Sequence, residues 1–177
     1  SGEGIKKFSN VKINTTYAPI AVVSGVSKET KSFVELDYFP KNCINLLTKE
    51  EGYGLAGGIS LSNKDECNEY LDKVMKKHMD LNASIKEEYR YIGLKNEITF
   101  KNEPRGYLYH IVDSGDNMWS IIPGKFSLAF SLAPEFYRRV YNKNPNKKFT
   151  PAHLDINSDH FVSNTVWLDT LNKNRKQ

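Results

Sequence analysis

The fold of this chain is decided by the stretch SNKDECNEYLDKVMKKHMD, which runs from Ser62 to Asp80. Its apolar residues recur at intervals of three and four, the spacing that puts side chains on one face of an α-helix. This stripe consists of Cys67, Tyr70, Leu71, Val74, Met75 and His78. Ser62 or Asn63 can cap the free amides at the start of such a helix. We therefore predict an amphipathic helix at about 62–80 whose striped face is buried.

The segments before this helix favour β-strands. Residues 11–16, 20–26 and 32–39 are rich in β-branched and aromatic side chains, which are typical of strands. The stretch Cys43 to Leu47 is also apolar and could pack against the striped face of the helix. Gly52–Gly58 contains four glycines, and we interpret it as a mobile or tightly turned loop.

A second helical segment is predicted directly after the first. Over residues 81–92, Leu81, Ile85, Tyr89 and Ile92 fall on one helical stripe, and Gly93 is a residue type that ends helices. Beyond Gly93 the pattern of apolar residues changes to the period of strands. Turn-forming residues separate four predicted strands of an antiparallel meander, at 97–101, 106–112, 117–122 and 125–132.

The last of these predicted strands has the clearest alternation in the chain. Apolar Phe126, Leu128, Phe130 and Leu132 alternate with small or polar residues, a pattern that gives a sheet one apolar face. Pro134 is then suited to the first turn of a short helix ending at Tyr141. The segment 161–171 is apolar enough to be ordered, but its period fits a strand or a helix.

These elements predict an α+β fold. An antiparallel sheet, made of the C-terminal meander of about four strands plus the N-terminal strands, has one apolar face that needs a cover. The amphipathic helix at about 62–80 supplies a stripe of suitable size. We expect residues 1–10 to form a flexible leader and residues 11–177 to form a single α+β domain, because 177 residues are enough to bury one core.

Composition excludes several classes of function. Hydrophobic residues make up 39% of the chain, but no apolar run approaches the roughly 18 residues needed to cross a bilayer. The net charge is only +4, from 25 basic and 21 acidic residues. The bases are scattered along the chain, whereas nucleic-acid binding needs them clustered. We expect neither a membrane span nor a nucleic-acid partner.

Cys43 and Cys67 bear on the cellular compartment. If Cys43 to Leu47 packs on the helix, the two sulfurs can form a disulfide, which indicates an oxidising environment. The same residues could equally be unpaired apolar fillers, since free cysteine is often buried. The chain opens with Ser1 rather than Met, as after a processed export signal, a lipid-anchored N-terminus or a tag. We expect a periplasmic or secreted protein.

Searches for catalytic and cofactor motifs give weak candidates. Gly52-x-Gly54-x-x-Gly57 has the letters of a dinucleotide fingerprint, but no clear strand precedes it and the following helix opens with acidic residues. The segment His153–His160 holds two histidines and alternating Asp and Asn oxygens, yet lacks the glycine and glutamate of a calcium loop. We predict no cofactor, no metal and no catalytic residue. The alternative is a small hydrolase, with or without a metal, that uses His110, Asp113 and the His153–His160 segment.

Tyrosine and arginine, the residue types favoured at protein interfaces, are concentrated in one part of the chain. The candidate binding residues are Tyr89, Arg90, Tyr91, Arg105, Tyr107 and Tyr109. Tyr107 and Tyr109 would share one face of a strand, which either faces outward as a docking surface or is buried between layers.

The functional hypothesis that follows is an exported, non-enzymatic protein that binds a protein partner. A concrete version is a periplasmic immunity protein, lipid-anchored in its full-length form, that neutralises a toxin by occluding it. Besides the hydrolase, a carbohydrate- or lipid-binding module that uses exposed tyrosines is a further alternative.

Overall fold

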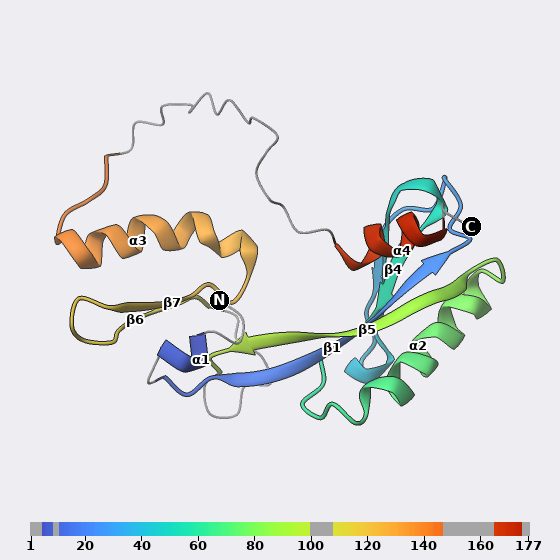
Figure 1. Cartoon of the computed structure of the whole chain (residues 1–177), viewed down its shortest axis with the longest axis horizontal. Coiled ribbons are helices and arrows are strands. Elements are labelled where there is room, and N and C mark those ends of the chain that lie inside the picture. The colour runs from blue at the N-terminus through green and yellow to red at the C-terminus, as the bar shows by residue number, and fades with distance from the viewer. Residues whose placement is uncertain (1–4, 9–10, 100–107, 147–164, 175–177) are drawn as a thin grey trace. The chain divides into compact units, whose positions relative to one another are not determined.

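The computed structural model describes residues 5–8, 11–99, 108–146 and 165–174. It has a five-stranded antiparallel sheet, a second sheet of two strands and helices, which confirms the predicted α+β class (Figure 1). The contacts within the chain define two units. We call Thr16–Lys95 with Ser163–Gln177 the sheet unit, and Ser1–Thr15 with Asn96–Val162 the hairpin unit.

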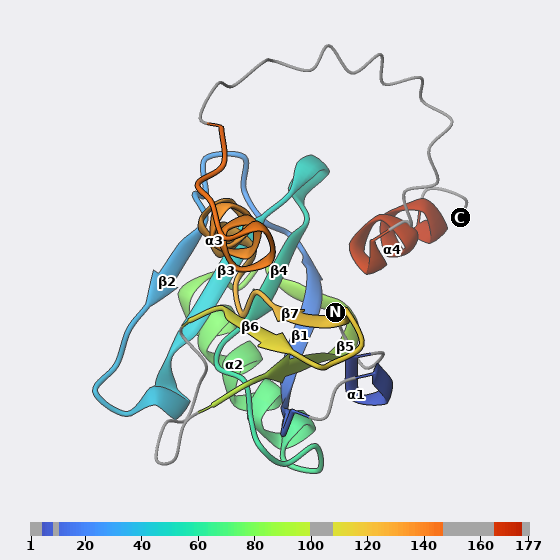
Figure 2. The same cartoon turned by 90° about the vertical axis from the view of Figure 1, so that its left-hand side faces the viewer.

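The five-stranded sheet has the strand order β2-β3-β4-β1-β5, so β2 and β5 are its edges among the described residues. Figure 2 shows β2, β3 and β4 side by side. The strands are β1 (Asn14–Ser24), β2 (Phe33–Glu35), β3 (Ile44–Thr48), β4 (Gly54–Gly57) and β5 (Lys86–Glu97). Two single 3-10 turns, η2 (Pro40–Asn42) and η3 (Glu50–Gly52), flank β3.

Helix α2 (Cys67–Leu81) covers one face of this sheet and confirms the predicted stripe, because all six of its members are buried. They pack in one cluster with residues of the sheet, such as Val23, Leu46 and Ala56. The helix begins at Cys67 rather than Ser62, because the backbone N–H of Asp65 donates to Asn63 Oδ1 (3.0 Å) and the N–H of Cys67 donates to the Lys64 carbonyl (3.1 Å). These bonds form a turn ahead of the helix.

The strand register decides which side chains face α2. Phe33 pairs with Leu46, Leu46 with Ala56, and Ala56 with Ala21, so these residues form one row across the sheet. The Phe33 ring lies 5.9 Å from the His78 ring of α2, which shows that this row faces the helix. Side chains alternate along a strand, so Val34, Asn45 and Leu47 lie on the opposite face.

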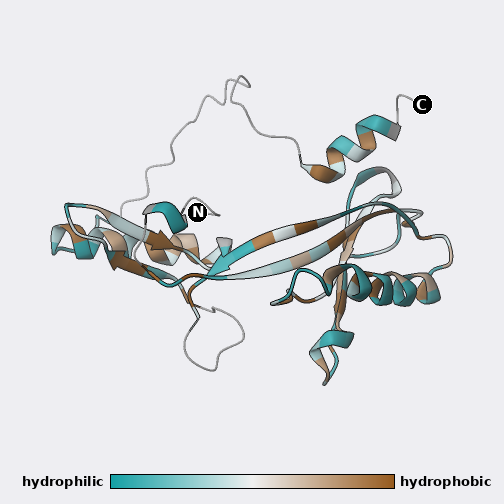
Figure 3. Cartoon of the chain, turned by 60° about the horizontal axis from the view of Figure 1, so that its bottom comes forward, coloured by the Kyte–Doolittle hydropathy of each residue, from teal (hydrophilic) through white to brown (hydrophobic). Residues whose placement is uncertain are grey.

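Helix α4 (Val166–Asn174) lies on the opposite side of the sheet from α2 (Figures 1 and 3). Its Leu171 is buried, and the Lys49 ammonium sits 5.5 Å from the centre of the Trp167 ring. The segment 161–171, whose period was ambiguous, is thus helical from Val166 onward, and residues 161–164 lie outside the described residues.

The hairpin unit contains a smaller layer of helix on sheet. Strands β6 (His110–Asp113) and β7 (Trp119–Ile122) pair in antiparallel fashion. The turn η4 (Phe126–Leu128) leads into helix α3 (Ala129–Tyr141). Helix α3 contacts the hairpin through the Phe136 ring, 5.9 Å from the Trp119 ring, and through Arg139, which donates to the Ile111 carbonyl at 2.9 Å. The short helix α1 (Ile5–Phe8) belongs to the same unit.

Two predictions of secondary structure are wrong. Residues 81–92 do not form a second helix, because Asn82 ends α2 in an extended conformation and β5 begins at Lys86, hydrogen-bonded to β1. Residues 125–132 do not form a strand, because they belong to η4 and the start of α3. Leu128, Leu132 and Phe136 also fit a helical stripe, and this period prevails over the alternation that ends at Leu132.

Further boundaries differ from the prediction. Residues 11–16 and 20–26 were expected as separate strands, but β1 runs through Pro19 without a break. This is possible because β4 pairs with β1 only from Ile20 onward, so the missing N–H of Pro19 costs no bond to β4. Part of the expected Gly52–Gly58 loop is strand β4. The meander is reduced to β6 and β7 among the described residues, since 100–107 lie outside them.

The predicted disulfide between Cys43 and Cys67 is wrong, because both thiols are free. The backbone of Cys43 does face α2, and its carbonyl accepts a hydrogen bond from the Tyr70 hydroxyl at 3.2 Å. Its side chain points elsewhere, to Asp37, whose N–H donates to Cys43 Sγ at 3.3 Å. Cys67 instead donates to the Asn63 carbonyl at 3.6 Å. The two cysteines therefore carry no argument for an oxidising compartment.

Candidate functional site

The structure brings together part of the predicted Tyr and Arg set. Tyr89, Arg90 and Tyr91 lie on edge strand β5 of the sheet unit. Tyr109 belongs to the hairpin unit, just before β6, and is half-buried. Arg105 and Tyr107 lie outside the described residues, so whether the Tyr107 and Tyr109 row faces outward stays a prediction.

The three residues on β5 border a hollow of about 380 Å³ that extends to α2 and the turn before it. Its lining is completed by Lys64, Asn68, Leu71 and Ile92. Arg90 is already engaged there. Its guanidinium binds the Glu87 carboxylate at 2.6 Å and Asp72 of α2 at 2.9 Å, and these contacts raise the pKa of Arg90. Its charge ties β5 to α2, which makes Arg90 a structural residue rather than a free binding group.

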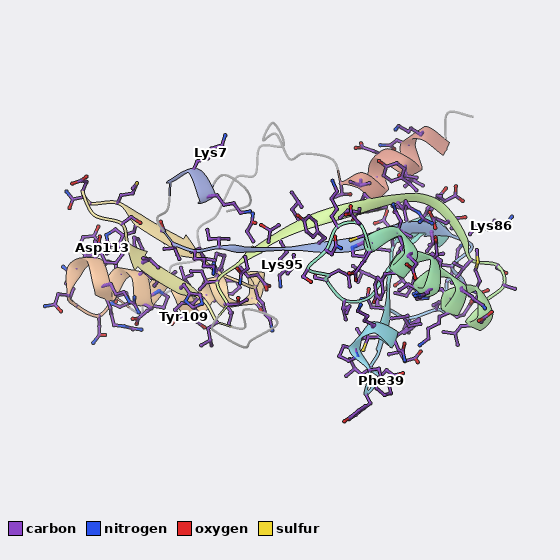
Figure 4. All side chains as sticks on the ribbon, turned by 90° about the horizontal axis from the view of Figure 1, so that it is seen from below. Lys7, Phe39, Lys86, Lys95, Tyr109 and Asp113 are labelled. Atoms are coloured by element: carbon purple, nitrogen blue, oxygen red, sulfur yellow. The ribbon has the colours of Figure 1, made fainter. Side chains whose placement is uncertain are left out.

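A second surface, which the sequence did not reveal, surrounds the other edge strand. We call it the β2 patch: Val34 (65% exposed), Leu36 (82%), Tyr38 (92%), Phe39 (64%) and Leu47 (47%). The Tyr38 and Phe39 rings meet edge to face with centroids 5.3 Å apart. Figure 4 shows Phe39 projecting outward from the sheet unit. Exposed apolar side chains gathered in this way on a folded protein make the β2 patch a candidate site of interaction.

Two hollows lie beside β2, one on each face of the sheet. The hollow on the face opposite α2 has about 380 Å³ and is lined by Ser32, Phe33, Val34, Asn45, Leu46 and Leu47. The hollow next to the end of α2 has about 400 Å³ and is lined by Thr30, Phe33, Leu46, His78, Leu81, Asn82 and Ile85. Neither lining contains an acidic or a lysine or arginine side chain, so both hollows suit apolar groups.

His78 is the one ionisable residue in these linings, and it is 1% exposed. Burial lowers the pKa of its imidazole, while the Asn45 carbonyl and the Glu35 carboxylate oppose this shift in part. Neither ring nitrogen reaches a partner at hydrogen-bonding distance and angle within the described part of the chain. The imidazole is therefore neutral at pH 7 and acts as an apolar ring packed against Phe33.

The described residues offer little for catalysis. Burial raises the pKa of the Cys67 thiol, which is the opposite of what a nucleophile needs. His110 and Asp113 are three positions apart on β6 and so point to opposite faces. Among the described residues, no three His, Cys, Asp or Glu side chains gather as metal ligands. The His153–His160 segment of the hydrolase alternative lies outside them.

None of the helices described for this chain is long and apolar enough to cross a bilayer. No model of a known protein family, no curated protein and no solved structure matches the chain.

The surface with the strongest structural support as a functional site is the β2 patch. Among the described residues, the fold provides it with an open strand edge, exposed aromatic rings and two neutral hollows.

Proposed function

We propose that this chain is a non-enzymatic binding protein that holds a protein partner through the β2 patch. The observation that supports it is the gathering of four exposed apolar side chains, Val34, Leu36, Tyr38 and Phe39, within six consecutive residues at a sheet edge. Aromatic residues dominate the energy of protein interfaces when a partner desolvates them. Left in water, the exposed parts of these rings gain no burial on folding.

The local structure supports a pre-formed site. The backbone N–H of Phe39 donates to Asp37 Oδ1 at 2.8 Å, and η2 follows directly, with the N–H of Asn42 donating to the Phe39 carbonyl at 2.8 Å. These bonds favour one conformation of the backbone on both sides of Phe39 in the absence of a partner. A rigid segment loses less conformational entropy on binding than a mobile one.

A narrower form of the proposal keeps the prediction of a toxin-neutralising protein outside the cytoplasm. In that form the partner is a toxin, and the β2 patch covers its active site. The test is an activity assay on the purified partner. One equivalent of the chain should abolish the toxin's activity, and a variant that lacks the aromatic rings of the patch should leave that activity intact.

The general proposal is tested by affinity capture from the source organism with matched baits. The wild-type chain is compared with the double variant Tyr38→Ser/Phe39→Ser, and with Phe130→Ser as control. Phe130 is 79% exposed but belongs to the hairpin unit, so its removal changes surface apolarity without touching the patch. We expect a protein that the wild type and the control retain and the double variant loses. Capture of no protein, or equal capture by all three baits, contradicts the proposal.

A further inference from the structure

We propose that the partner segment held at the β2 patch is an extended strand that adds to the free edge of β2, with apolar residues on both faces and an acidic residue opposite Lys31. This inference rests on the proposed function and specifies the chemistry of the partner. It is carried by the open edge, by the two hollows that flank it and by the charge beside it.

The edge of β2 offers backbone groups for pairing. Strand β2 hydrogen-bonds to β3 on one side only, and no described strand lies on its other side. Proteins that do not use such an edge protect it with charges, prolines or bulges. Here the central residue is Val34, and the charge of Glu35 is balanced by Lys77 of α2 at 3.9 Å. Among the described residues the edge is therefore open, with Glu35 compensated by Lys77 and the exposed Lys31 two residues before the strand.

The two hollows match the side-chain alternation of an added strand. Successive residues of a strand point to opposite faces of the sheet, and in strand addition the pockets for alternate side chains give specificity. A residue opposite Phe33 would lie on the same face of the sheet as the hollow that contains His78. Its two neighbours would lie on the other face, beside the hollow lined by Val34 and Leu47. Both linings are uncharged, so these three residues should be apolar.

Charge complementarity fixes one end of the partner segment. Lys31 is exposed and lies between Thr30, which lines one hollow, and Ser32, which lines the other. It forms no ion pair within the described part of the chain. An acidic residue placed opposite Lys31 would gain a favourable cross-strand pair, and a basic one would be repelled.

The experiment uses a labelled peptide and the full chain, with binding followed by fluorescence anisotropy. Pairing of β2 with β3 is antiparallel, and an antiparallel strand with Leu opposite Phe33 and Asp opposite Lys31 has the sequence Thr-Val-Leu-Val-Asp, blocked at both ends. One control peptide ends in Lys in place of Asp. A second control is methylated on its backbone nitrogens and cannot donate to the edge.

We expect the Asp peptide to bind at least about threefold more tightly than the Lys peptide, and the methylated peptide to lose at least about tenfold in affinity. The variant Lys31→Glu should reverse the order of the first two peptides. Because Lys31 is exposed, this variant should fold as the wild type does, which its thermal melt will show. Absence of saturable binding, equal binding of the methylated peptide, or an unchanged order in Lys31→Glu overturns the inference.

Two further outcomes separate this inference from the proposed function. If a captured protein depends on Tyr38 and Phe39 but is indifferent to Lys31→Glu and to competing peptide, the proposed function stands and strand addition is wrong. If the peptide binds but no protein is captured, the proposed function fails. Sedimentation of the chain alone tests whether a second copy of this chain occupies the edge. A dimer that Val34→Lys dissociates would assign the edge to that second copy and overturn the inference.

Discussion

Helices α2 and α3 each pack on a small antiparallel sheet, but they bury very different amounts of side chain. Helix α2 buries six residues in a continuous core, whereas the buried part of α3 is Leu132, with Phe136 and Tyr137 half-buried. Helix α3 also leaves Phe130 and Tyr141 exposed. Local stability follows the amount of apolar contact, so the sheet unit should hold most of the stability of the chain and the hairpin unit should open more readily.

The largest effect is expected from Gly25→Ala. Gly25 has φ +75°, and a Cβ there would lie 1.9 Å from the Ser84 carbonyl oxygen. Because this contact is with backbone, the connection between α2 and β5 would have to move, at a cost of roughly 3 kcal/mol or more. The matched control is Gly115→Ala in the hairpin unit, where φ is +80° but no atom lies within 4 Å. That change should cost about 1 kcal/mol from backbone strain alone.

Thermal unfolding followed by circular dichroism distinguishes these two variants. The main transition of Gly25→Ala should shift far below that of the wild type, while that of Gly115→Ala should stay close to it. Equal shifts for both would show that the contact with Ser84 does not constrain the sheet unit.

Truncation of matched core leucines compares the two helices directly. Leu71→Ala in α2 removes a side chain that is 1% exposed and should lower the free energy of unfolding by about 3 kcal/mol. Leu132→Ala in α3 should cost less, about 1–2 kcal/mol, because its surroundings are thinner and can collapse. Hydrogen exchange should show faster exchange across the whole sheet unit in the first variant, and only in β6, β7 and α3 in the second. The reverse pattern would contradict the assignment of most of the stability to the sheet unit.

Removal of one hydroxyl should also weaken the sheet unit. Tyr70 Oη accepts from the Ile59 N–H at 2.9 Å and donates to the Cys43 carbonyl at 3.2 Å, so it links α2 to the residue before β3 and to the segment after β4. Tyr70→Phe leaves both backbone groups without this partner and should cost about 1–2 kcal/mol in urea unfolding. Tyr141→Phe, at an exposed position of α3, is the control and should change nothing measurable.

The smallest effect is a dependence on pH that belongs to the sheet unit. Burial lowers the folded-state pKa of His78 below its unfolded value near 6.5. The unfolded state therefore binds more protons below pH 6.5, and the free energy of unfolding should fall as the pH drops through that window. The groups facing the ring are Phe33 and Glu35 of β2, the latter paired with Lys77. In His78→Phe this part of the dependence should vanish, as urea midpoints between pH 8 and 5 will show.

The helix that forms the core could be predicted because its six-residue stripe fits only one period. Strand β5 could not, since Leu81, Ile85, Tyr89 and Ile92 also fit a helical stripe. Its conformation is decided by pairing with β1, some 70 residues earlier in the chain, and local pattern carries no information on such a partner. The same limit affected Phe130, which the alternation placed in a sheet and the structure leaves exposed on α3.

The candidate site shows a similar limit. Val34, Leu36 and Tyr38 alternate in the sequence and could be assigned to one face of a strand, but the sequence does not say whether anything covers that face. The disulfide failed for a related reason. Cys43 was correctly placed near α2 through its backbone, yet the direction of its side chain depends on a hydrogen bond to Asp37 that spacing alone does not predict.

Because both thiols are free, thiol labelling can measure how fast this protein opens. Cys43 is partly accessible and lies next to the β2 patch, whereas Cys67 has no exposed surface. A thiol-specific reagent should modify the first at once and the second only when the core around α2 separates. The slow phase would time that separation at Cys67 in any variant, and a dye on Cys43 would report when a partner arrives.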